Sequence, residues 1–225
     1  MGQNHSFWMG GELEMIPGFS GLESELVAPV FRLERLPRGS FVFYPDDVAE
    51  SLYVVAEGWA RLFSIRSESE EVTVAVLGRG QVFGEAALRQ GQSYGNFCET
   101  ITDLEIYSAQ GKDLLELARI HPEVGRALAR LLSERIGLAQ GDLVALRFKD
   151  VLPRVARAVL TAMQPSEGGF EVTLSHQDLA YLAFSTRETV TKALGDLAFQ
   201  GILELGYRRI MVVDLEALRR AAAGK

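Results

Sequence analysis

The sequence predicts an α+β protein with an N-terminal antiparallel β barrel or jelly roll, a long helix, and a C-terminal helix-turn-helix followed by a β-hairpin. Short segments rich in Val, Ile, Phe and Tyr, separated by turn signals, run from about residue 31 to residue 107. Helical periodicity replaces them near Gly111 and continues to about Asp150. Two short helices and an alternating segment follow. We therefore expect three regions, 1–111, 112–150 and 151–225.

The N-terminal region contains four clear strand signals. They are FVFYP, SLYVVAEGWARLFSI, EVTVAVLG and LEIYS, and the dipeptide Glu57-Gly58 and the triplet Gly78-Arg79-Gly80 mark turns between them. We interpret the acidic run SESEE at residues 67–71 as a solvated hairpin turn. The preceding stretch GLESELVAPV predicts a short helix. Many short strands with frequent turns are typical of a closed antiparallel fold.

The central region predicts a helix that begins at Pro122, because proline is favoured in the first turn of a helix. Apolar residues then follow a 4-3-4-3 spacing, which is the a/d seam of a helix pair, at Leu132, Ile136, Ala139, Leu143 and Leu146. Two interpretations of this seam stay open. The helix packs on its own barrel, or it pairs with the same helix of a second copy.

The C-terminal region predicts alternating short elements. Asp150 is expected to cap the helix VLPRVARAVLTAM, QPSEGG to form a loop, and FEVTL a strand. Ser175 and Asp178 form an N-terminal capping pattern for the helix SHQDLAYLA. After the tight turn FS, a second helix runs until Gly201, and ILELGYRRIMVVD predicts a hairpin that turns near Gly206-Tyr207. The segment LEALRRAAA predicts a final short helix.

The second helix of this pair is amphipathic. Its apolar sector can pack on the first helix, and its polar sector, near the helix N-terminus, is then free to contact base edges of DNA. We expect base contacts from Arg187, Glu188, Thr191 and Lys192, with a phosphate as the alternative for Lys192, and phosphate contacts from Ser185 and Thr186. The alternative is an ordinary solvated face in which Glu188 pairs with Lys192. Arg208 and Arg209 are candidates for contacts with the DNA backbone, or they are merely solubilising charges.

Composition limits the possible classes of protein. The net charge of −7 lies in the first part of the chain, since residues 1–150 carry −8 and residues 151–225 carry +1. No long apolar run predicts a membrane span, and the N-terminus does not resemble a secretory signal, so we expect a cytoplasmic protein. The single cysteine, Cys98, is expected to be a buried small hydrophobe. His5, His121 and His176 lack metal-site spacing, so no metal is expected.

The segment LSHQDLAYLAFSTRETVTKALGDLAFQGILELGYRRIMVVD resembles the DNA-binding half of the cyclic-AMP receptor protein/FNR family. GRGQVFGEAAL is similar to the family's glycine-rich element in the barrel, and Phe148-x-Asp150-Val151 resembles the hinge after its dimer helix. The resemblance covers roughly residues 30–215. It implies a jelly-roll, cyclic-nucleotide-binding-like sensor domain, a homodimer and a C-terminal winged helix-turn-helix. It also implies an activator that binds a palindromic TGTGA-like site in double-stranded DNA and contacts RNA polymerase.

The resemblance weakens at the family's effector pocket. Gly84 and Glu85 are present, but Tyr94 and Gly95 stand where the family has the Arg-Ser that holds the cyclic phosphate. Ala139 and Gln140 fall where cyclic-AMP-binding members have two hydroxyl residues. Arg89 is nearby in sequence, but we place it on the wrong side of the loop to hold the phosphate. We therefore expect no cofactor and a vestigial pocket of Gly84, Glu85, Tyr94, Gly95 and Gln140. The alternative is an unidentified small-molecule effector.

Rival classes find less support in the sequence. An enzyme on a cupin-like barrel needs several inward histidines and a carboxylate on a metal, yet no histidine occurs between His5 and His121. Serine and cysteine hydrolase signatures are also absent from the sequence. A ligand-binding sensor that acts only through protein partners stays open, and it predicts no operator binding and tolerance of Arg187→Ala. We expect a protein that is not an enzyme.

Overall fold

The computed structural model describes residues 24–67, 70–147 and 150–224, with side chains described for 26–66, 70–141 and 150–224. The chain divides into two compact units, 1–140 and 141–225. In the first unit the elements are α1 (Ser24–Val27), η2 (Ala28–Val30), β1 (Phe31–Leu36), β2 (Phe41–Phe43), β3 (Ser51–Glu57), β4 (Ala60–Ser67), β5 (Glu70–Leu77), β6 (Val82–Phe83), η3 (Glu85–Leu88), β7 (Phe97–Thr100), β8 (Leu104–Gln110) and α2 (Gly111–Ile120). Helix α3 (Pro122–Arg147) begins in this unit.

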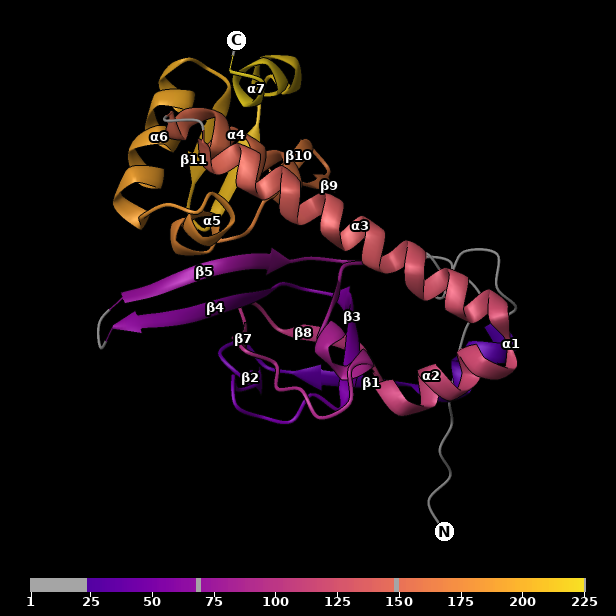
Figure 1. Cartoon of the computed structure of the whole chain (residues 1–225). Helices are drawn as coiled ribbons and strands as arrows, with labels where there is room; N and C mark the ends of the chain where they lie inside the picture. Colours follow the sequence, from indigo (N-terminus) through magenta and orange to yellow (C-terminus); the bar gives the residue numbers. More distant parts are fainter. Residues whose placement is uncertain (1–23, 68–69, 148–149, 225) are drawn as a thin grey trace. The chain divides into compact units, whose positions relative to one another are not determined.

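The first unit is built from two four-stranded antiparallel sheets. Their strand orders are β1-β8-β3-β6 and β2-β7-β4-β5, and the hairpin of β4 and β5 extends beyond the other strands (Figure 1). This arrangement confirms the predicted β fold. The sequence patterns did not single out β1, β6 and β7, because β1 is an edge strand with exposed charges and β6 has only two residues. In the SESEE run, residues 68 and 69 lie outside the described part, but Ser67 pairs with Glu70 across the hairpin.

Two apolar clusters hold the first unit together. One is made of side chains from both sheets, among them Phe43, Phe83 and Ile106. The second joins β1, β3 and β8 to the helices, and Leu114 of α2 and Val124 of α3 are fully buried in it. The break between α2 and α3 falls at His121, as predicted. The first turns of α3 are thus anchored on the β1-β8-β3-β6 sheet.

Cys98 lies in the cluster between the sheets and is fully buried. This burial confirms the sequence prediction, and desolvation raises the pKa of its thiol. The thiolate is the reactive species, so the Cys98 thiol of the native protein is expected to resist aromatic disulfide reagents. Cys98 should be labelled only as fast as the protein unfolds. Mass spectrometry after a timed pulse, with and without denaturant, measures this. Rapid labelling of the folded chain would contradict the burial.

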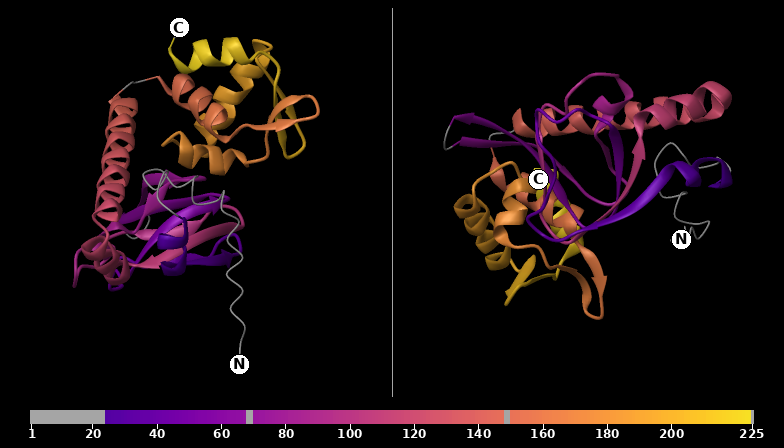
Figure 2. Two further views of the ribbon diagram at one scale, coloured as in Figure 1. Left: turned by 90° about the vertical axis from the view of Figure 1, so that its right-hand side faces the viewer. Right: turned by 90° about the horizontal axis from the view of Figure 1, so that it is seen from below.

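The second unit contains α4 (Val151–Ala162), α5 (His176–Leu182), α6 (Arg187–Phe199), α7 (Leu215–Ala222) and four strands. The strands are β9 (Gln164–Ser166), β10 (Gly169–Val172), β11 (Leu203–Gly206) and β12 (Arg209–Val212), in the sheet order β11-β12-β10-β9. Helix α4 packs against α5, α6 and α7, and α6 also contacts β11 (Figure 2). Helix, turn, helix and hairpin therefore follow one another as predicted.

Two local expectations for this unit were wrong. QPSEGG is not a loop, because Gln164–Ser166 form β9, which pairs with β10. Pro165 is tolerated there since β9 is the edge strand of its sheet. Asp150 occupies the N-cap position of α4, but its side chain makes no capping hydrogen bond. By contrast, Gly201 follows α6 with a positive φ of 73°, which suits its predicted role of ending that helix.

Candidate nucleic-acid interface and effector cavity

The turn between α5 and α6 is held by local hydrogen bonds. Ser175 and Asp178 form the predicted capping box at the start of α5. Phe184, in the turn, has a φ of 48°, which is unfavourable for a residue with a Cβ. The Phe184 carbonyl accepts a hydrogen bond of 3.3 Å from the Arg154 guanidinium of α4. The turn is thus tied to α4, a contact that the sequence patterns did not show.

Helix α6 has the two faces that its sequence predicts. Val190, Ala193, Leu194 and Leu197 are buried, whereas Arg187, Glu188, Thr191 and Lys192 are exposed. Within the described residues, Glu188 and Lys192 form no ion pair. The alternative of a solvated face in which these two residues pair is therefore not supported. Thr186 is the N-cap, and its hydroxyl oxygen accepts from the Thr189 N–H at 3.3 Å. Ser185, half-buried, immediately precedes it.

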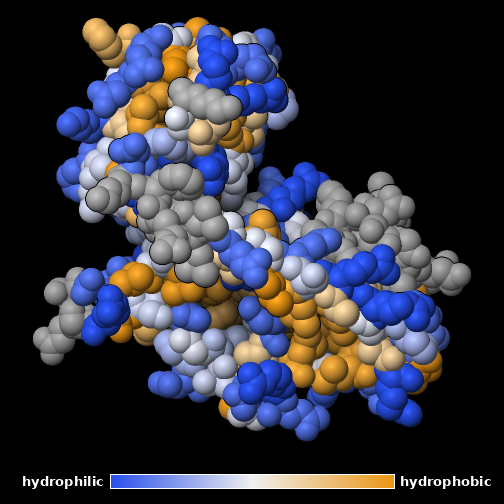
Figure 3. Space-filling model, turned by 45° about the horizontal axis from the view of Figure 1, so that its top comes forward, coloured by the Kyte–Doolittle hydropathy of each residue, from blue (hydrophilic) through white to orange (hydrophobic). Residues whose placement is uncertain are grey.

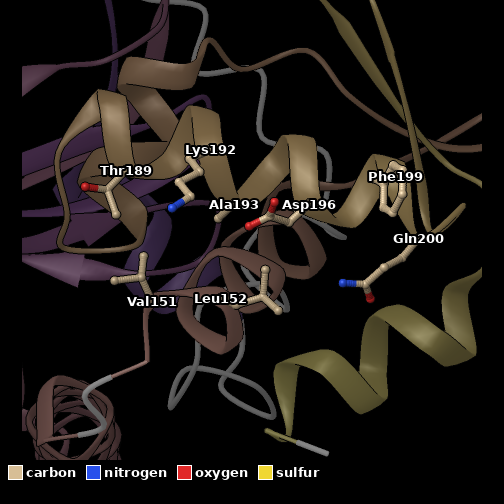
Figure 4. Close-up of a pocket in the computed structure, with 8 residues that line it drawn as sticks. All are labelled: Val151, Leu152, Thr189, Lys192, Ala193, Asp196, Phe199 and Gln200. Carbon is tan, nitrogen blue, oxygen red and sulfur yellow. The ribbon is translucent and has the colours of Figure 1, made fainter.

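Lys192 lies at the edge of this exposed face. Together with Thr189 and Asp196 it lines a groove of about 370 Å³ between α6 and the start of α4. Figure 4 shows these side chains on the α6 side of the groove and Val151 and Leu152 on the opposite side. The structure therefore brings Arg187, Glu188 and Thr191 onto one open face, with Lys192 directed toward its border.

Sequence reasoning missed one contact of this face. The Thr191 hydroxyl lies 2.9 Å from Nδ1 of His176, the first residue of α5. The two residues are fifteen positions apart, and the periodicity of one helix carries no information on which side chain of another helix meets it. His176 is thereby placed beside the predicted base-reading residues.

The hairpin that follows α6 presents the two other predicted arginines differently. Arg208 occupies the turn with a φ of 55°, and its guanidinium lies 5.9 Å from the centre of the Tyr207 ring. Arg209 forms an ion pair of 4.0 Å with Glu171 of β10. Arg208 is therefore the better placed of the two for a phosphate, since Arg209 is already paired with a carboxylate.

The predicted seam of α3 is only partly described. Leu132 packs against the sheet and helix core of its own unit, whereas Ile136 is 58% exposed. Ala139 and Gln140 are also exposed, and the side chains of Leu143 and Leu146 lie outside the described residues. Within the described residues, the seam thus begins against its own unit at Leu132 and is exposed at Ile136 and Ala139. Other exposed apolar side chains of the first unit include Ile65, Val72, Val74, Leu115, Ile120 and Leu138. Figure 3 shows that apolar surface is gathered in patches on the molecule.

The first unit also contains a cavity of about 220 Å³. Of the five residues expected in a vestigial effector pocket, it includes Gly84, Glu85 and Tyr94. Gly95 and Gln140 are not among its lining residues. The remaining wall is formed by Phe43, Leu62, Ala86, Arg89 and Asn96. The placement of Arg89 on the wrong side of the loop was incorrect, because Arg89, the residue that follows η3, lines the same cavity.

Both units match known protein families. Residues 33–121 match the cyclic nucleotide-binding domain, and residues 153–221 match the Crp-like helix-turn-helix domain. The chain is 34% identical over 211 residues to the cyclic AMP receptor protein of Thermus thermophilus, covering 92% of this chain and 97% of the relative. The chain belongs to the CRP/FNR family of transcription regulators. Its relatives in this family are regulators and not enzymes, as the sequence predicted.

Two further members illustrate the range of the CRP/FNR family. The global nitrogen regulator of Synechocystis is 31% identical, over 89% of this chain and 92% of its own length. A CRP-family transcriptional regulator from Thermus thermophilus has a similar structure, with a TM-score of 0.72 and 28% identity over 84% of this chain and 96% of that one. These matches confirm the predicted fold class and the DNA-binding helix-turn-helix. In the described residues, no helix has the length and apolarity of a membrane span.

Tyr94 shapes the cavity of this CRP/FNR-family chain. Its ring stacks on Phe43 with centroids 3.8 Å apart, and its hydroxyl lies 3.1 Å from both the backbone N–H and the carbonyl oxygen of Ser51. Gly84 makes this packing possible. A Cβ there would lie 2.7 Å from the Ser51 carbonyl oxygen and 3.3 Å from the Tyr94 ring. Tyr94 is thus part of the local packing of the barrel.

The two charged groups next to Tyr94 differ in their surroundings. Glu85 lies 4.0 Å from the Arg135 guanidinium of α3, whose side chain is only 16% exposed. Arg89 is exposed and lines the cavity. The cavity is therefore lined by one carboxyl group, of Glu85, and one guanidinium group, of Arg89.

Proposed function

We propose that this regulator is a cytoplasmic homodimer that activates transcription from a palindromic TGTGA-like site, contacts RNA polymerase, and binds DNA without cyclic AMP. The open face of α6 carries this proposal. Its Arg187 and Glu188 have no ion pair or hydrogen bond among the described residues, and they are free to bond guanine and cytosine edges in the major groove. The exposed Ile136 supports a second copy on α3.

Independence from cyclic AMP is supported by the cavity in the first unit. Its volume of about 220 Å³ is below the roughly 300–1,000 Å³ of ordinary small-molecule sites. The Tyr94 hydroxyl is already bonded to Ser51 and is neutral, so it is a weak replacement for the guanidinium that a buried cyclic phosphate requires. A ligand changes an equilibrium only if it binds one state better than the other.

Fluorescence anisotropy with a labelled palindromic TGTGA operator tests this proposal. We expect the same midpoint with and without saturating cyclic AMP, and no saturable heat in calorimetry. The Thermus thermophilus relative is named for cyclic AMP, which makes this nucleotide the first ligand to test. A tenfold tightening, equal to about 1.4 kcal/mol of coupling, would contradict ligand independence. An operator that binds no more tightly than scrambled DNA would contradict the site itself.

A second candidate function is favoured by Arg89. Because this cation lines the cavity, a small anionic effector could be held there by charge-assisted hydrogen bonds. Under this alternative, Arg89→Ala removes the response of DNA binding to the effector and leaves basal binding unchanged. A screen of anionic metabolites by thermal shift, repeated on Arg89→Ala, distinguishes the two candidates. Stabilisation of the parent protein alone would favour an effector-dependent regulator.

A further inference from the structure

Thr191 departs from the usual hydrogen bonding of a threonine in a helix. The Thr161 hydroxyl of α4 donates back to the Arg157 carbonyl at 2.9 Å, which is the common i−4 pattern. The Thr191 hydroxyl is instead directed across to His176, with 2.9 Å between Oγ1 and Nδ1. Among the described residues, this is the one hydrogen bond of the Thr191 side chain.

The His176 contact selects one side-chain conformation of Thr191. Threonine in a helix divides between two χ1 conformations, because its hydroxyl can reach a carbonyl of the preceding turn. A hydrogen bond to His176 removes this freedom and turns the hydroxyl toward α5. Since Oγ1 and the methyl group share the same Cβ, a fixed hydroxyl also fixes the direction of the methyl group. Thr191 is exposed, so a fixed methyl group is presented on the surface.

We propose that the His176–Thr191 pair recognises the 5-methyl group of a thymine in the DNA site. The inference rests on the proposed role of α6 as the base-reading helix, because Thr191 shares its open face with Arg187. In the major groove a thymine methyl is recognised by apolar contact, and a threonine methyl is suited to this. His176 is a positioning residue here, and Thr191 makes the contact. This contact adds a thymine to the guanine and the cytosine that we expect Arg187 and Glu188 to recognise.

Uracil substitution tests this contact directly, because deoxyuridine differs from thymidine only by the methyl group. Each symmetric pair of thymines in a selected operator is replaced in turn, and full-length dimer affinities are measured by anisotropy. We expect one position at which uracil weakens binding about fourfold per half-site, the effect of one buried methyl group. Thr191→Ser, which keeps the hydroxyl and loses the methyl, should bind thymine and uracil operators equally.

Two matched variants of His176 separate positioning from stability. His176→Asn retains a polar atom at the position of Nδ1 and should keep the uracil effect, whereas His176→Ala should reduce it at least by half. Unfolding temperatures of both variants show whether α5 is intact, and a stable His176→Ala with the full uracil effect would overturn the role of His176. If Arg187→Ala weakens binding but no thymine is sensitive to uracil, the contact is wrong while the helix placement stands. If neither substitution matters, the placement of the helix itself has failed.

Discussion

Replacing Ile136 with lysine is expected to convert the proposed dimer into a monomer and to weaken operator binding by about 100-fold or more. Ile136 is 58% exposed in the single chain, so the substitution leaves the core of its own unit intact. In a helix pair, however, the ammonium group would be buried against an apolar partner face. Two linked DNA-binding units gain roughly 10²–10⁴ in affinity over one, and a monomer loses this gain. Sedimentation and anisotropy measure the two effects.

Leu138→Lys is the matched control for this experiment. Leu138 is 46% exposed and lies two residues further along the same helix, away from the 4-3-4-3 seam. The same charge at this position should leave the dimer and the DNA affinity unchanged. Dissociation by Leu138→Lys but not by Ile136→Lys would place the interface on another face of α3. A parent chain that sediments at 24.8 kDa would contradict the dimer altogether.

Arg187→Ala is expected to weaken operator binding by about 1–3 kcal/mol per half-site and to relax the preference for one G·C pair. A guanidinium donates two hydrogen bonds to guanine O6 and N7, and alanine leaves both acceptors unpaired. Arg187 is exposed at the first position of α6, so its removal should not disturb the buried stripe. Affinity for a panel of single-base operator variants measures the effect, and circular dichroism checks that the helices remain.

Arg208→Ala removes the same charge from the hairpin turn and serves as the comparison. A phosphate contact carries no base preference, so we expect weaker binding to all operator variants alike and a smaller dependence on salt concentration. If Arg187→Ala kept full affinity and the same base preference, α6 would not be the recognition helix. If Arg208→Ala altered base preference, the hairpin would read bases as well as the backbone.

The sequence by itself determined the elements that depend on local patterns. The capping pair Ser175 and Asp178, the helix stop at Gly201 and the buried stripe of α6 all depend on residues a few positions apart. The break before Pro122 was predictable for the same reason, and the burial of Cys98 followed from the general tendency of a single cysteine to be buried. Such patterns state which face of an element is apolar, and one core must cover that face.

The tertiary structure decided the features that join residues far apart in the chain. The strand at Gln164–Ser166 forms because β10 offers it a free edge, although its own residues read as a loop. Arg89 lines the cavity together with residues of distant strands, and Thr191 meets His176 because α5 and α6 pack together. Side-chain contacts between elements depend on the angle and register of their packing. A period of 2 or 3.6 residues contains no information on either, so these contacts could not be predicted from the sequence.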